Sequence, residues 1–261
     1  MGSVGVTVTT FLYSNLTLNY FFLVLVFFAT LFSYNLQNLS ERKVHKDRSN
    51  QIIWIKSNNK IIKFITLIAL FFSILFYFFS LNYFAVFISS PFLLLVIFYR
   101  INFFNKIKFR NIPGLKILII AICWTWACCL LPQILYSTNI DWTLACFIFL
   151  YIILITIPFD IRDLEYDEKI KTIPQQIGAR NALFSSFFLI IILFLLFVYL
   201  ANYKLCVFLL ITCLILLPSI KSINEFYYLI FIDGLLIILP FFSLWTIITA
   251  SFVPSGNDIT S

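Results

Sequence analysis

The sequence predicts an all-α membrane protein, a bundle of about eight transmembrane helices, and two observations predict it. Hydrophobic residues make up 62% of the 261 residues and charged residues only 11%, whereas a soluble domain carries about a quarter charged residues. Apolar segments close to the length of about 20 residues that a bilayer core requires recur along the whole chain. The polar stretches between them are too short for a soluble domain, so we expect residues 1–261 to form a single transmembrane domain.

Eight apolar segments are expected to cross the bilayer. They are residues 17–39, 61–79, 83–99, 114–131, 143–159, 182–201, 205–220 and 227–249. Residues 4–13 are also apolar but are shorter than a crossing requires. This stretch is the remnant of a further helix, an interfacial segment, or an addition to the natural chain.

Positive charges are distributed unequally between the loops. All of the 18 Lys and Arg residues except Lys204 lie in or beside the loops that follow the first, third, fifth and seventh segments. Because basic loops stay in the cytoplasm, we expect a multi-pass protein of the bacterial inner membrane with these four loops on the cytoplasmic side. The net charge of +7 then reflects topology and contact with anionic membrane lipids, and it does not indicate nucleic-acid binding.

The six cysteines all lie in apolar segments, and none has the spacing of a zinc site. We therefore expect neither disulfides nor a zinc centre.

Acidic residues are concentrated just after the fifth segment, at residues 160–169. Five of the chain's 11 acidic residues lie in this stretch. If the helix continues, Asp160, Asp163 and Asp167 share one face at positions i, i+3 and i+7. Carboxylates on one face repel each other unless a cation lies between them, and Mg²⁺ prefers oxygen ligands, often together with substrate phosphates. The three aspartates are therefore candidate metal ligands and catalytic residues of a magnesium-diphosphate site.

Basic residues are interspersed with these acids. Arg162, Lys169 and Lys171 are candidate substrate-binding residues that would hold diphosphate oxygens. In the alternative interpretation the stretch is a solvated loop, in which these basic residues only neutralise the carboxylates.

The stretch resembles the second aspartate-rich motif of the UbiA family of intramembrane prenyltransferases. Asp160, Asp163 and Asp167 match the motif one for one, and Lys171-Thr172-Ile173-Pro174 and Gly178 follow it. The resemblance implies an all-helical bundle in which two aspartate-rich motifs on cytoplasmic loops bind Mg²⁺ and a prenyl diphosphate. It further implies that the isoprenoid tail lies among the helices, that an aromatic or other lipophilic acceptor is alkylated, and that residues 4–13 are a missing or shortened first helix.

The first motif of the family is altered in this chain. Its equivalent is the end of segment 17–39, where Asn35 and Asn38 stand in place of two aspartates and Arg42 in place of the third. Amide oxygens ligate Mg²⁺ without adding negative charge, so one metal site is weakened, and Arg42 would contact the diphosphate directly. Otherwise Asn35 and Asn38 are only polar residues at a helix end.

Asp233 lies within the last apolar segment, close to its expected cytoplasmic end. Ionisable residues inside membrane segments are often functional. Asp233 therefore either faces the same cavity as a substrate-binding residue or extends to the membrane interface.

These observations favour a Mg²⁺-dependent membrane prenyltransferase, which transfers an isoprenyl group from a prenyl diphosphate to an unidentified acceptor and releases diphosphate at the cytoplasmic face. The altered first motif favours an alternative, a catalytically silent UbiA-like protein that binds an isoprenoid or lipid or has a structural role. A small transporter has less support, because the sequence has neither paired intramembrane charges nor an internal repeat.

Overall fold

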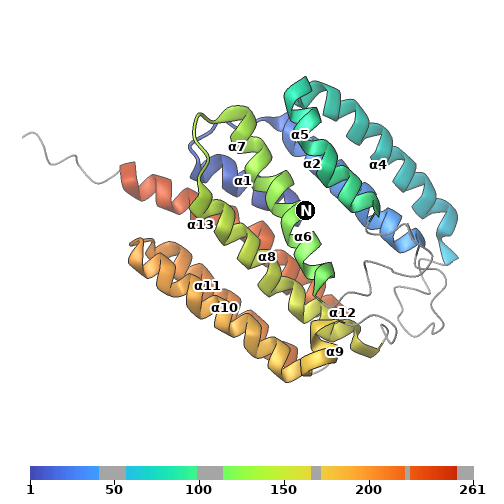
Figure 1. Ribbon diagram of the computed structural model, residues 1–261. Coiled ribbons are helices and arrows are strands. Elements are labelled where there is room, and N and C mark those ends of the chain that lie inside the picture. The colour runs from blue at the N-terminus through green and yellow to red at the C-terminus, as the bar shows by residue number, and fades with distance from the viewer. Residues whose placement is uncertain (41–56, 99–113, 166–171, 221–223, 252–261) are drawn as a thin grey trace, which may run out of the picture.

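The computed structural model describes residues 1–40, 57–98, 114–165, 172–220 and 224–251. Within these ranges the chain is almost entirely helical and contains no strand (Figure 1). The helices are α1 (Gly2–Tyr13), α2 (Tyr20–Ser40), α4 (Asn59–Ser80), α5 (Tyr83–Phe98), α6 (Leu115–Thr125), α7 (Leu131–Tyr136), α8 (Trp142–Arg162), α9 (Ile173–Ile177), α10 (Ala179–Tyr199), α11 (Tyr203–Leu216), α12 (Glu225–Tyr227) and α13 (Asp233–Ser251). Short turns of π or 3-10 geometry join some of them: η2 (Trp126–Leu130), η3 (Asp163–Glu165), η4 (Leu217–Ile220) and η5 (Tyr228–Ile232).

Each predicted membrane segment coincides with a helix or with a continuous run of helical turns. In the described part of the chain, four helical runs are long and apolar enough to cross a membrane: Asn59–Ser80, Leu115–Tyr136, Trp142–Arg162 and Ala179–Tyr199. Four shorter apolar helices accompany them, at Tyr20–Leu36, Tyr83–Leu95, Tyr203–Ser219 and Tyr228–Leu244. The predicted fold class, an all-α transmembrane bundle, is confirmed, and the protein is an integral membrane protein.

Residues 4–13 belong to α1, a short helix that is buried inside the bundle. Val6, Thr10 and Phe11 are fully buried, so the interpretation of this stretch as an interfacial segment is wrong. The helix lies against α13, and Gly5 allows the contact: a Cβ at this position would lie 2.1 Å from the Leu236 carbonyl oxygen. The position of α1 agrees with a shortened first helix.

A hydrogen bond joins α1 to η2 beside a proline. Pro132 has no N–H to donate to the carbonyl of Cys128, one helical turn earlier. Thr10 Oγ1 donates to this same carbonyl at 2.9 Å. The helical run therefore continues through the π-type turn η2 to Tyr136, five residues beyond the predicted end of this segment at residue 131.

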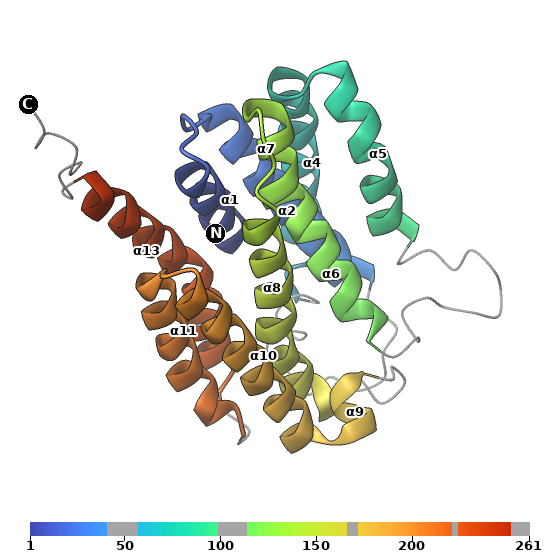
Figure 2. The same ribbon diagram turned by 60° about the vertical axis from the view of Figure 1, so that its left-hand side comes forward.

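The helices that start at one end of the bundle share a capping device. An Asn or Asp side chain accepts a hydrogen bond from the backbone N–H three residues later at the start of α2, α5, α8 and α11; the capping residues are Asn19, Asn82, Asp141 and Asn202. These bonds satisfy N–H groups that have no partner within the helix. The start of α6, the end of α8 and the short helices α9 and α12 lie at the opposite end (Figures 1 and 2).

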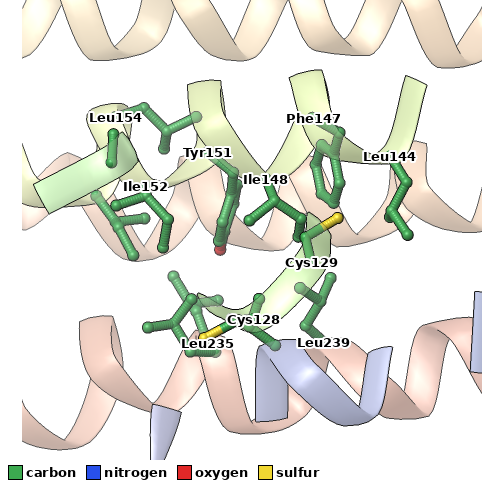
Figure 3. Packing of buried hydrophobic residues seen from close by; sticks show 14 of the residues in the cluster. Cys128, Cys129, Leu144, Phe147, Ile148, Tyr151, Ile152, Leu154, Leu235 and Leu239 are labelled. Atoms are coloured by element: carbon green, nitrogen blue, oxygen red, sulfur yellow. The ribbon is translucent and has the colours of Figure 1, made fainter. Parts of the chain in front are cut away.

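Helix α8 forms the centre of the core. Its buried side chains, Phe147, Ile148 and Tyr151 among them, face Cys128 of η2 and Leu235 of α13 (Figure 3). The Tyr151 hydroxyl is hydrogen-bonded to Thr212 Oγ1 at 3.2 Å, so this buried polar group is satisfied. The core fixes the position of α8, and the last turn of α8 contains the polar residues Asp160 and Arg162.

We expect Gly5→Ala to destabilise the protein, because the added Cβ would force α1 and α13 apart. Overpacking of this kind costs about 1–3 kcal/mol. Thermal unfolding of the purified protein in detergent, followed by tryptophan fluorescence, should show a lower midpoint for Gly5→Ala than for the wild type.

Gly234→Ala is the matched control, because a Cβ at Gly234 meets no neighbouring atom within 4 Å. In a helix, alanine is favoured over glycine by up to about 1 kcal/mol, so this variant should unfold at the wild-type temperature or above it. Equal midpoints for Gly5→Ala and the wild type would contradict the close contact between α1 and α13.

Candidate functional site

Asp160 lies in the last turn of α8 and is buried, with only 2% of its side chain exposed. Its Oδ1 accepts a hydrogen bond from Lys116 Nζ at 2.6 Å. Lys116 belongs to the first turn of α6, so this ion pair joins α6 to α8. The alternative interpretation of the acidic stretch as a solvated loop is therefore wrong for Asp160.

Asp163 has a different cationic partner. Helix α8 ends at Arg162, and Asp163 begins the 3-10 turn η3. The two guanidinium nitrogens Nε and Nη2 of Arg162 donate to Asp163 Oδ1 and Oδ2 at 2.7 and 3.2 Å, in the two-pronged geometry that arginine favours with carboxylates. The α-helix expected to carry all three aspartates on one face thus ends before Asp163, where the chain tightens into η3.

Arg162 also connects α8 with the last membrane segment. Its guanidinium carbon lies 5.3 Å from the centre of the Phe159 ring and 5.5 Å from that of Tyr228, in η5. Such contacts between a cation and a ring face are attractive. Asp233, the first residue of α13, is half-buried at the same end of the bundle, within electrostatic range of Arg162 and the amino terminus. We therefore group Asp233 with Arg162 and Asp163 by position, although no direct contact joins them in the described part of the chain.

The structure describes only some of the remaining predicted site residues. Asn35 is half-buried on α2. Asn38 belongs to α2, but its side chain lies outside the described residues, and so do Arg42, Asp167, Lys169 and Lys171 in full. The polar cluster that the structure describes consists of Lys116, Asp160, Arg162, Asp163 and Asp233.

Lys116 is the member of this cluster that was not predicted from the sequence as a site residue. In the sequence it is the last of the basic residues around the loop that follows the third segment, and topology accounts for it. One signal was available: Lys116 is already inside the apolar segment that begins after Gly114, where a lysine is costly without a partner.

A metal ion requires more ligands than this cluster supplies alone. In the part of the chain that the structure describes, no three His, Cys, Asp or Glu side chains gather in a way that would hold a metal. Asp160 and Asp163 each bind a cationic side chain. Mg²⁺ is often held by one or two carboxylates together with water and substrate phosphates, so these residues fit Mg²⁺ as a site that a diphosphate completes.

A cavity of about 240 Å³ lies among the helices, and no residue of the polar cluster lines it. Residues of α2, α4, α5, α6 and η2 line it, and most of them are apolar or aromatic. Ile119 and Ile120 of its wall follow Lys116 by one turn of α6, and Phe22 lies on α2 toward the opposite end of the bundle.

No protein-family model matches the sequence, and no curated protein sequence matches it. Among solved structures, the chain is similar to a UbiA homolog from Archaeoglobus fulgidus bound to GPP and Mg²⁺. The similarity covers 100% of this chain and 87% of that chain, with a TM-score of 0.53 and 16% sequence identity. Likeness at this identity establishes the fold: the protein is an integral membrane protein with a UbiA-like helical bundle, as the sequence motif implied.

We expect Asp160→Asn to destabilise the protein by about 1.5–3 kcal/mol, because it leaves Lys116 without its charged partner at a largely buried position. Asp163→Asn should cost only about 0–1 kcal/mol, since its ion pair is more exposed. Thermal unfolding in detergent measures both variants.

The double variant Lys116→Met/Asp160→Asn tests the cause of this loss. It removes both charges, so it should unfold at a higher temperature than Asp160→Asn alone. Equal losses for Asp160→Asn and Asp163→Asn would show that the Lys116–Asp160 pair does not stabilise the bundle.

Proposed function

We propose that the protein is a Mg²⁺-dependent membrane prenyltransferase, which moves an isoprenyl group from a prenyl diphosphate to a lipophilic acceptor. The observation that carries this proposal is the polar cluster of Lys116, Asp160, Arg162, Asp163 and Asp233 at one end of a UbiA-like bundle. The wall of an apolar cavity begins one turn further along α6, at Ile119 and Ile120. Further support comes from the similar structure, because that UbiA homolog is bound to GPP and Mg²⁺.

Lys116 and Arg162 bind the diphosphate in this proposal. In the free protein their charges are directed to Asp160 and Asp163, and an incoming diphosphate offers both cations additional oxygen acceptors. The planar guanidinium of Arg162 matches phosphate oxygens as well as it matches a carboxylate. Arg42, Lys169 and Lys171 are proposed to add positive charge around the same group.

Asp160 and Asp163, together with Asp167, are proposed to hold Mg²⁺ once the diphosphate supplies further oxygens. The bound ion would neutralise negative charge that develops on the leaving diphosphate. Asn35 and Asn38 are proposed to contribute amide oxygens at the opposite side of this group.

The cavity supplies a setting for the carbon chemistry. As the bond between C1 and the diphosphate oxygen breaks, its electron pair leaves with the diphosphate and positive charge develops on the prenyl carbon. Aromatic walls such as Phe92, Trp124 and Trp126 favour a cation and exclude water. The acceptor then forms a bond to C1 and gives up a proton to solvent.

The proposal includes the orientation of the protein in the membrane. We infer that residues 1–261 act as a single transmembrane domain and that the polar cluster faces the cytoplasm, because the loops at this end contain almost all of the basic residues.

One observation favours a second candidate, a UbiA-like protein that binds a prenyl diphosphate or another lipid without transferring it. Asn35 occupies the half-buried position on α2 where the family motif has an aspartate. A site with fewer carboxylates holds Mg²⁺ more weakly, and binding would then persist without turnover.

We expect geranyl diphosphate to bind the purified protein in the presence of Mg²⁺ and to bind at least about tenfold more weakly in EDTA, which corresponds to about 1.4 kcal/mol. Asp160→Asn and Asp163→Asn should reduce the Mg²⁺-dependent affinity by a similar factor, because each removes a proposed ligand. Isothermal titration calorimetry in detergent measures these affinities.

Asp141→Asn is the matched control, because Asp141 caps the opposite end of the same helix. Its affinity should equal that of the wild type, since asparagine caps helices as well as aspartate does. Equal, weak binding of all four proteins with and without Mg²⁺ would refute the site. Mg²⁺-dependent binding without release of diphosphate, even after a membrane lipid extract is added, would favour the silent alternative.

A further inference from the structure

The apolar cavity extends along two helical walls that run in opposite directions. On α2 its lining extends from Ser33, toward the polar end of the bundle, to Phe22 near the start of the helix. On the helical run of α6, η2 and α7 it extends from Ile119, one turn beyond Lys116, to Leu131. Because a helix rises about 1.5 Å per residue, each wall is about 17 Å long. The cavity is therefore elongated, and its near end is the one closer to Lys116.

Phe22 closes the far end of the cavity. Its side chain is fully buried, and its ring contacts the Phe11 and Tyr136 rings edge-on, with 6.1 and 6.0 Å between the ring centres. The Phe11 and Tyr136 rings lie 5.7 Å apart. Neither Phe11 nor Tyr136 is among the described residues that line the cavity, so Phe22 separates them from it. These three rings form an aromatic plug behind the cavity.

Hydrogen bonds hold the aromatic plug in position. Asn19 Oδ1 accepts from the backbone N–H of Phe22 at 3.0 Å, and Asn19 Nδ2 donates to the Tyr136 hydroxyl at 3.2 Å. The same hydroxyl donates to the backbone carbonyl of Ser80, the last residue of α4, at 3.3 Å. The plug thus joins α2, α4 and α7, and a ligand can displace it only by breaking these bonds.

Two dimensions of the cavity limit the length of an isoprenoid tail. An extended polypeptide advances about 3.5 Å for three backbone bonds, so an extended isoprene unit, with four bonds along the chain, advances about 4.7 Å. A length of about 17 Å therefore holds three units but not a complete fourth unit. The volume gives a smaller number. A protein cavity of about 150 Å³ binds one benzene molecule, so a cavity of about 240 Å³ holds about ten carbon atoms, which make two units.

We propose that the cavity selects a short prenyl diphosphate, with two or three isoprene units in its tail, and that Phe22 sets this limit by closing the far end. The inference rests on the proposed function and deepens it, because it takes the diphosphate to bind at the polar cluster and the tail to lie in the cavity. A longer tail would have to displace the aromatic plug. Phe22 is then a residue that determines specificity, and it contacts the last isoprene unit of the tail.

The experiment compares four compounds that share a head group and differ in tail length: geranyl, farnesyl, geranylgeranyl and hexaprenyl diphosphate, with two, three, four and six isoprene units. The full chain in lipid nanodiscs binds tritiated geranyl diphosphate in the presence of Mg²⁺, and each unlabelled compound competes for the site. Partition of each compound into empty nanodiscs is measured and subtracted. We expect the geranyl and farnesyl compounds to compete at least about tenfold more strongly than the two longer ones.

Two variants change the depth of the cavity in opposite directions. Phe22→Ala removes a ring of about the volume of one isoprene unit from the far end, so geranylgeranyl diphosphate should compete about tenfold more strongly than it does with the wild type. Val26 lines the cavity one turn nearer the polar cluster. Val26→Phe would leave a length of about 11 Å, enough for two units and not for three. Farnesyl diphosphate should then compete about tenfold more weakly, with little change for geranyl diphosphate.

Phe21→Ala is the matched control. It removes the neighbouring ring of α2, which is 57% exposed and does not line the cavity, so the order of preference should be that of the wild type. Inorganic diphosphate, which has no tail, should compete equally with all four proteins. Equal competition shows that the polar cluster is intact in each variant. If Phe22→Ala fails this check, the loss of farnesyl binding in Val26→Phe decides the question.

Two results would overturn this proposal alone. Equal competition by all tail lengths in the wild type would show that the tail leaves the cavity for the lipid. An unchanged order of preference in Phe22→Ala and Val26→Phe would show that the far end of the cavity does not limit the tail. In both cases Mg²⁺-dependent binding persists, and the proposed function stands. Absence of Mg²⁺-dependent binding at every tail length would instead overturn both proposals.

Discussion

The ion pair between Lys116 and Asp160 is the interaction on which the candidate site depends. Lysine lies in the first turn of α6 and aspartate in the last turn of α8. Both charges have the wrong sign for their helix ends, since a helix dipole favours anions at its start and cations at its end by about 0.3–1 kcal/mol. Each charge is tolerated because it neutralises the other. The pair must therefore offset the unfavourable position of both charges, and in the proposed function it also places a cation and a carboxylate side by side.

The two ends of the bundle differ in the polar groups that they contain. At one end, an Asn or Asp side chain accepts a hydrogen bond from one N–H group in the first turn of each of four helices. Asn19 and Asp141 are two of these caps. Backbone groups near a membrane must find such partners, because lipid offers none. The opposite end carries Lys116, Asp160 and Arg162, whose charges are directed to other side chains. Caps therefore stabilise one end, whereas ion pairs between helices and side chains hold the other end, where the proposed function places the diphosphate.

The sequence predicted the eight long segments because their apolar length and composition leave no other stable state. It predicted α1 only as one of three alternatives for residues 4–13. A short run rich in glycine and threonine becomes a buried helix through partners far away in sequence, the Leu236 backbone at Gly5 and the Cys128 carbonyl at Thr10. The same limit applies to the candidate site. Asp160 was predicted as a site residue from its neighbours in sequence, whereas its partner Lys116 precedes it by 44 residues. Spacing alone does not reveal such a contact.

On α6, the charged residue Lys116 and the first residues of the cavity wall are separated by about one helical turn. Lys116 faces Asp160, and one turn later Ile119 and Ile120 form the wall of an apolar cavity. Ions are stable at Lys116 and hydrocarbon is stable in the cavity. In the proposed function, these two surfaces of α6 receive the diphosphate head and the isoprenoid tail of the substrate. Separation of the two charges during bond cleavage would then follow the structure: the anion stays with Lys116 and Arg162, and the carbon cation develops among aromatic rings.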